Sequence, residues 1–174
     1  MKKINALVAL YSGLAIAMTF LFLTQLILTN GKNSAGSKDH LIDIWCATHF
    51  LWGAVLAGFW HGVTGETFKR RWKTSRWLAM TVTCICAWEM VEFPMEIGVF
   101  GPAIKQWMDG VEPLPNRFLV DPVFTFLGAM ACRQDRRIYK PALVLTATWA
   151  TFNLLAPTAM SVQGQILTFV SSVF

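Results

Sequence analysis

The sequence has little charge: Asp, Glu, Lys and Arg make up 14% of its 174 residues. A soluble domain usually carries about a quarter of such residues. Hydrophobic residues reach 55%, and the mean hydropathy is +0.47. This balance argues against a soluble globular domain and favours a membrane protein, and the length suits one domain that covers 1–174.

Cysteine is also scarce, and the four present lie inside or beside apolar segments. Cys84 and Cys86 are two residues apart, so on a helix they point to different sides and cannot bind one ion together. No zinc-ligand spacing and no disulfide framework is evident. The cysteines are therefore expected to be small buried residues.

The net charge of +5 does not indicate nucleic-acid binding, because the basic residues are bunched in short loops between apolar runs. That distribution is a topology signal. Lys2 and Lys3 precede the first run, the loop 66–76 holds five basic residues, and 133–140 holds four. These segments are expected in the cytoplasm, together with the N-terminus.

The apolar runs predict an all-α fold, a polytopic transmembrane helix bundle of about five spans in a bacterial inner membrane. Four or six spans are the alternatives. The first run is too long for the core of a signal peptide. The uncharged tail 161–174 is too short to span again, and it either lies at the outer surface or packs back on the bundle. The expected spans are 4–30, 43–64, 77–99, 117–132 and 141–160.

The fourth span is unusual because Asp121-Pro122 resembles a helix start, an N-cap followed by a proline at the first helical position. The segment from Pro122 to Cys132 has only 11 residues, about half of what a bilayer needs. Either the helix begins earlier, near Arg117, and is kinked, or the outer loop dips into the membrane and the helix starts at depth.

Acidic residues gather late in the third span. Glu89, Glu92 and Glu96 stand at positions i, i+3 and i+7, so they share one face of a helix. An ionised carboxylate inside a bilayer is costly unless it meets a partner or water. The expected topology places Glu92 and Glu96 at the same outer level as His49 of the second span, and Glu89 nearer the middle of the membrane.

Asp121 and Arg117 of the fourth span belong to that level as well, which predicts a polar pocket near the periplasmic face. The proposed ligand-binding residues are Glu89, Glu92, Asp121, His49 and Arg117.

Several chemistries fit these residues. A divalent cation could bind Glu92, Asp121 and His49. Acid–base chemistry on a lipid-linked substrate and a proton or cation path are further uses. The structural alternative is a network in which Arg117 pairs with Glu92 or Glu96. The sequence does not decide whether the protein is an enzyme.

The residues also resemble a family. Trp88-Glu89 with Glu92, then Asn116-Arg117, and Asp121 followed seven residues later by Gly128 are similar to the VanZ-like and YjdF-type small membrane proteins. That family usually has Asn where this chain has Thr125. The resemblance covers about 45 residues and implies a protein of the cell envelope, some members of the family being linked to glycopeptide tolerance. It adds weight to Glu89, Glu92 and Asp121 without naming a substrate.

Two hypotheses follow. In the first, the pocket binds a cation or a lipid-linked or amphipathic ligand. In the second, the chain is a non-catalytic accessory subunit of a larger membrane complex, with small-residue and Trp-rich faces as docking surfaces. Such a complex could be associated with a pigment or with redox chemistry, since His49 lies beside tryptophans. Membrane lipids, bound lipid among them, and other membrane subunits are the expected partners.

Overall fold

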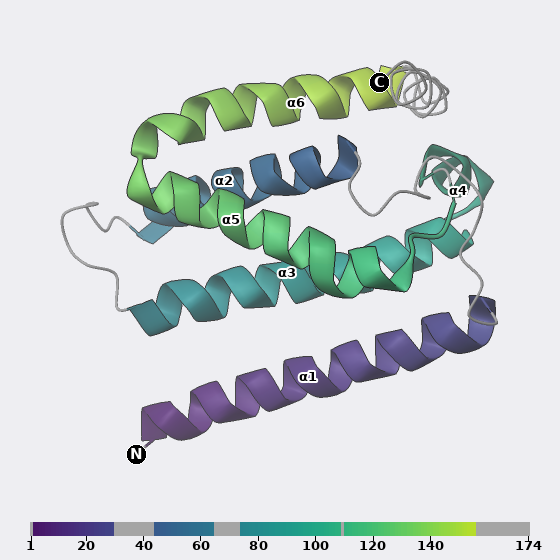
Figure 1. Ribbon diagram of the computed structural model, residues 1–174, viewed down its shortest axis with the longest axis horizontal. Coiled ribbons are helices and arrows are strands. Elements are labelled where there is room, and N and C mark those ends of the chain that lie inside the picture. Colours follow the sequence, from purple (N-terminus) through teal and green to yellow (C-terminus); the bar gives the residue numbers. More distant parts are fainter. Residues whose placement is uncertain (1, 30–43, 65–73, 109, 156–174) are drawn as a thin grey trace, which may run out of the picture.

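The computed structural model describes residues 2–29, 44–64, 74–108 and 110–155 (Figure 1). Within these ranges the chain is helical and has no strand, which confirms the all-α prediction. His40 and the tail 161–174 lie outside the described residues, as does the side chain of His61. The elements are α1 (Lys2–Thr29), α2 (Ile44–Thr64), α3 (Thr74–Ile97), α4 (Pro102–Met108), η1 (Asn116–Val120), α5 (Asp121–Gln134), η2 (Arg136–Ile138) and α6 (Tyr139–Leu155).

The long helices run lengthwise, side by side, and the short helix α4 lies at the end of the bundle where α3 ends (Figure 1). Helix α2 packs mainly on α5 and then on α6, while α1 packs on α3. The arrangement thus brings α1, α3, η1 and the segment 110–115 to one end of the bundle, where α2 begins.

Two glycines set the close approach of α2 and α5. A Cβ atom on Gly53 would lie 1.8 Å from the carbonyl oxygen of Thr125, and one on Gly128 would lie 1.8 Å from that of Phe50. Both positions therefore exclude any side chain. Small residues of this kind let helix backbones touch, which is the usual way helices associate in lipid.

The apolar core lies along the same interface. Ala54, Ala57 and Ala129 are buried there, together with Trp77 and Cys132. Trp77 also contacts the ring of Phe126, with ring centroids 5.6 Å apart. This half of the bundle has the residue pattern of ordinary helix packing.

Helix α3 passes through Pro94 and ends three residues later, at Ile97. Gly98 has φ +89°, a backbone conformation that glycine adopts readily. The Val99 N–H donates to the carbonyl of Pro94 at 2.9 Å, and the Gly98 N–H donates to that of Met95 at 3.2 Å. This pair of bonds is a Schellman motif, which closes the helix just after Glu96.

The fourth predicted span begins earlier than Asp121, which is the first of the two alternatives. The turn η1 is π-helical and leads straight into α5; the Asp121 N–H donates to the carbonyl of Asn116. The N-cap prediction for Asp121 is wrong, because the chain is already helical there and no side chain caps α5. Pro122 lacks an N–H, and the wider turn accommodates it.

One described helix is long and apolar enough to cross a bilayer, with the stretch Val8–Leu28 at a mean hydropathy of 1.8. A single such helix near the N-terminus is weak evidence, because a signal sequence has the same properties. Helices α5 and α6 have 14 and 17 residues, fewer than the ~20 of a typical span. Helix α3 is long enough but carries three glutamates.

Candidate functional site

Of the six acidic residues that the structure describes, five have side chains buried in one region. The chain has ten Asp and Glu residues, and five of them are at most 3% exposed. These are Glu89, Glu92, Glu96, Glu112 and Asp121. A carboxylate is almost never buried without a partner, so the partners decide what the region does.

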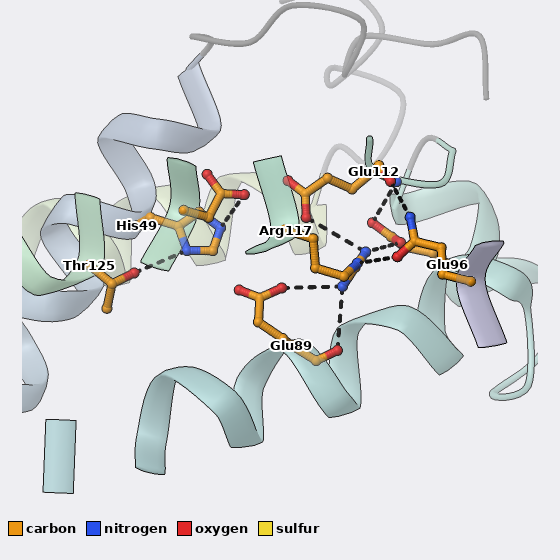
Figure 2. Close-up of polar contacts among 8 residues, drawn as sticks. His49, Glu89, Glu96, Glu112, Arg117 and Thr125 are labelled. Carbon is orange, nitrogen blue, oxygen red and sulfur yellow. Dashed lines mark hydrogen bonds and ion pairs between the residues drawn. The ribbon is translucent and has the colours of Figure 1, made fainter. Parts of the chain in front are cut away.

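Arg117 is the centre of the larger group, which we call the arginine cluster: Arg117, Glu89, Glu96, Glu112 and Gln25. The guanidinium is fully buried. Its Nη1 lies 3.2 Å from the Glu89 Oε2, and its Nη2 donates to the Glu96 carboxylate and lies 3.6 Å from the Glu112 Oε2. Figure 2 shows the guanidinium between these carboxylates. Each carboxylate is thereby held against a positive charge.

Other parts of the chain complete the arginine cluster. Arg117 Nε donates to the Gln25 Oε1 at 2.9 Å, which ties η1 to α1. The Gln25 Nε2 in turn donates to the backbone carbonyl of Glu112 at 2.6 Å. Phe93 lies beneath the guanidinium, with the Arg117 Cζ 5.6 Å from its ring centroid. The result is a charge-assisted network that links α1, α3, η1 and the segment 110–115.

A second group, the histidine pair, lies beside the first and consists of His49 with Asp121. The His49 Nε2 lies 3.4 Å from the Asp121 Oδ2, longer than the usual N–H···O hydrogen bond of about 2.7–3.2 Å. The other ring nitrogen, Nδ1, lies 3.3 Å from the hydroxyl of Thr125 (Figure 2). Asp121 and Thr125 are four residues apart, so both project from one face of α5 toward α2.

The close contact of α2 and α5 explains how these groups meet. Gly53 follows His49 by one helical turn, and its contact is with the backbone of Thr125 itself. The glycine that fixes the helix spacing therefore also fixes the distance between the imidazole and α5. Asp121 is near enough to Glu89 and Glu92 for their charges to interact, so the histidine pair and the arginine cluster share one electrostatic environment.

A cavity of about 410 Å³ opens beside the histidine pair, between α2, α3 and α5. His49, Glu89 and Thr125 contribute the polar part of its wall. The remaining wall is apolar or aromatic and consists of Trp52, Leu56, Cys84, Ile85, Ala87, Trp88 and Val91. We call this space the chain pocket. Its volume lies in the range of about 300–1,000 Å³ that ligand sites occupy.

The described residues contain one group of carboxylates that could hold a metal ion. Oxygens of Glu89, Glu92 and Glu112 lie within 4.8 Å of one another, and all three side chains are buried. The metal-ligand set predicted from the sequence was Glu92, Asp121 and His49. Only Glu92 belongs to the observed group, whose other two members are Glu89 and Glu112. The Arg117 guanidinium already contacts Glu89 and Glu112, and a cation so close would oppose a divalent ion.

The structure brings all five sequence-predicted residues into this region: Arg117 and Glu89 contact each other, His49 contacts Asp121, and Glu92 is buried near them. Sequence reasoning missed two residues of the arginine cluster. Gln25 gave a usable signal, because an amide inside the apolar run 4–30 needs a partner. Glu112 gave none, because a glutamate in a Pro- and Gly-rich loop is usually exposed.

Comparisons with protein-family models, with curated proteins and with solved structures found no match to this chain. The resemblance to VanZ-like proteins is therefore untested and stays a prediction.

Proposed function

We propose that the protein is a multi-pass protein of a bacterial inner membrane, with its N-terminus in the cytoplasm, that binds an amphipathic or lipid-linked molecule. The ligand's chain would occupy the chain pocket and its polar end would lie near His49, Asp121 and Glu89. The observation that carries this proposal is a cavity of about 410 Å³ whose wall is apolar or aromatic except for His49, Glu89 and Thr125.

The exposure of large apolar side chains on the outer surface of the bundle supports a location in the membrane. Large apolar side chains are exposed on helices at both edges of the bundle, with Ile16 71%, Phe20 72%, Val144 63% and Leu155 80% exposed. Several such side chains on one helix face would be a liability in water but are normal in lipid. The polar groups have the opposite distribution, since the carboxylates and Arg117 are buried inside.

The pocket is reached from the side of the bundle. Trp52 and Trp88 are 42% and 37% exposed and stack on each other, with centroids 6.1 Å apart. Val91, another wall residue, is 47% exposed. In a bilayer these residues would face the acyl chains, so a lipid-like ligand could enter without crossing water. A divalent cation is less well supported, because Arg117 occupies the centre of the carboxylates.

The test is the recovery of bound amphipathic molecules after purification from native membranes in a mild detergent, measured by native mass spectrometry. We expect the wild-type protein to retain such a molecule and Ala87→Phe, which fills the chain pocket, to lose it. Ala147→Phe is the matched control, because Ala147 is exposed on α6 and does not line the pocket. Equal retention by both variants would contradict the proposal.

The second function, an accessory subunit, is favoured by one observation: α1 is mostly exposed along Val8–Leu28. A helix that packs so little of its surface could contact another subunit instead of lipid. Co-purification of a fixed partner in mild detergent, lost when Ile16 and Phe20 are both changed to Ala, would support that function. An isolated monomer that retains its amphipathic ligand would contradict it.

A further inference from the structure

A second, smaller cavity lies next to the chain pocket, and five of the ten residues that line it are tryptophans. The chain has eight tryptophans, and five of them line this space of about 90 Å³. They come from four helices: Trp45 and Trp52 from α2, Trp88 from α3, Trp107 from α4 and Trp149 from α6. We call it the tryptophan cage. Tryptophans in a bundle usually pack against other side chains or lie at an interface, so their convergence on a cavity needs an explanation.

The charge around the cage favours a cation. Glu92 is part of its wall and is only 2% exposed. Behind it lie the other buried carboxylates of the region, which outnumber the Arg117 guanidinium. The π-face of an indole ring attracts a cation within about 6 Å of its centroid. Carboxylate and indoles therefore act in the same direction on any group inside the cage.

The composition of the wall narrows the kind of cation. A metal ion such as Ca²⁺ or Mg²⁺ needs several oxygen ligands, and the only side-chain oxygens in the wall of the cage belong to Glu92 and Thr48. A primary ammonium needs acceptors for three N–H groups. A quaternary ammonium has no N–H to satisfy and is the typical ligand of aromatic cages.

The volume of the tryptophan cage excludes large ligands. About 90 Å³ is well below the ~300–1,000 Å³ of sites that hold drug-sized molecules, so a pigment or haem does not fit. A compact tetrahedral group does.

The two cavities adjoin each other. His49, Trp52 and Trp88 line both, and the stacked Trp52–Trp88 pair lies where they meet. One molecule could thus place a chain in the larger space and a compact head group in the smaller one. We propose that the tryptophan cage binds the quaternary ammonium group of a ligand whose chain occupies the chain pocket; as a head-group subsite, this inference rests on the proposed function.

The first experiment uses the purified protein after bound amphipath has been washed out in an uncharged maltoside detergent, with tetramethylammonium as the probe and tryptophan fluorescence and calorimetry as readouts. We expect saturable binding of tetramethylammonium. Neopentyl alcohol, of similar shape but without charge, and potassium at the same concentration should not compete. Equal binding of the neutral molecule would overturn the proposal, because the cage would then be only an apolar hole.

Variants localise the binding. Trp107→Leu and Trp149→Leu each remove one ring of the cage and should weaken binding by roughly two- to thirty-fold. Trp107→Phe keeps an aromatic face and should lose less. Trp60→Leu is the control, because Trp60 does not line the cage, and its affinity should equal that of the wild type. Unchanged affinity in both cage variants, with wild-type melting temperatures, would overturn the assignment.

The source of the group is decided in lipid nanodiscs. If it is a lipid head group, phosphatidylcholine nanodiscs should raise the apparent Kd for tetramethylammonium relative to phosphatidylglycerol nanodiscs. If it is a free quaternary ammonium solute, the two Kd values should agree while soluble choline competes. The first result supports the head-group assignment, and the second would overturn it and leave the cage as a site for a free solute.

The proposed function is tested separately by the bound-amphipath measurement. Retained amphipath without tetramethylammonium binding would overturn only the head-group assignment. Tetramethylammonium binding without any retained amphipath would overturn the chain pocket and leave the cage as a site for a free solute.

Discussion

The arginine cluster and the histidine pair are equally buried, but their contacts differ. Arg117 uses all three of its nitrogens on Glu89, Glu96 and Gln25, with hydrogen bonds of 3.3 Å or less. The histidine pair has contacts of 3.3 and 3.4 Å, and His49 lines both cavities. A saturated network fixes a structure, whereas a looser pair on a cavity wall remains able to bind a ligand.

The comparison assigns different roles to residues that look alike in the sequence. Glu96 and Asp121 are both carboxylates with no exposed surface. Glu96 accepts from the Arg117 guanidinium and from the backbone N–H of Glu112, so it stabilises the end of the bundle. Asp121 faces His49, and its carboxyl group also lies within hydrogen-bonding range of that of Glu112. The first is expected to matter for folding, the second for binding.

The largest effect is expected from Arg117→Met. It leaves Glu89, Glu96 and Glu112 buried without their cation, which should cost about 3–5 kcal/mol of the free energy of unfolding. Little folded protein should be recovered, as measured by size-exclusion chromatography and thermal unfolding in detergent. Arg117→Lys keeps the positive charge but lacks the planar set of N–H donors. Its free energy of unfolding should lie between those of the wild type and the Met variant. A Met variant that melts like the wild type would contradict the structural role of the cluster.

Gly128→Leu is expected to have the next largest effect, because its side chain would collide with the backbone of Phe50 on α2. Separating α2 from α5 should destabilise the protein by roughly 3 kcal/mol, the upper end of the usual cost of overpacking. It should also move His49 away from Asp121 and abolish ligand retention.

Gly13→Leu is the matched control for Gly128→Leu. A Cβ atom on Gly13 of α1 would meet nothing within 4 Å, so the larger side chain has room and the helix gains a better former. Its unfolding temperature should equal or slightly exceed that of the wild type. Equal losses in both variants would show that glycine itself, and not the helix contact, is what the fold requires.

The sequence predicted much of this arrangement. Helical spacing placed Glu89, Glu92 and Glu96 on one face, and chain reversal through short loops placed His49, Arg117 and Asp121 at the same level. These inferences depend only on rise per residue and on chain direction, which are nearly constant in helices.

The pairing of these residues was predictable only in part, because it depends on helix rotation. The structural alternative named Glu96 as a partner of Arg117, which the structure shows, but it did not name Glu89. Arg117 lies in the π-helical turn η1, and from there it pairs with Glu89 and Glu96. Proline suggested a helix start at Asp121, and the helix instead continues through it. Glu112 and Gln25 join through contacts between segments far apart in the chain, about which local patterns carry no information.

The smallest change in stability is expected from Asp121→Asn, and it tests the comparison most directly. The substitution keeps the shape and removes the charge, and because the contact with His49 is long it should cost under about 1 kcal/mol. Glu96→Gln is the matched change in the arginine cluster and should cost about 1.5–3 kcal/mol, since it weakens a charge-assisted bond to Arg117. The unfolding temperature measures the stability of each variant, and retention of the bound amphipath measures its ability to bind ligand. We expect Glu96→Gln to lower stability while the folded fraction still retains ligand, and Asp121→Asn to do the reverse. The opposite pattern would exchange the roles of the two groups, because it would make the histidine pair the structural element and place the ligand among the carboxylates around Arg117.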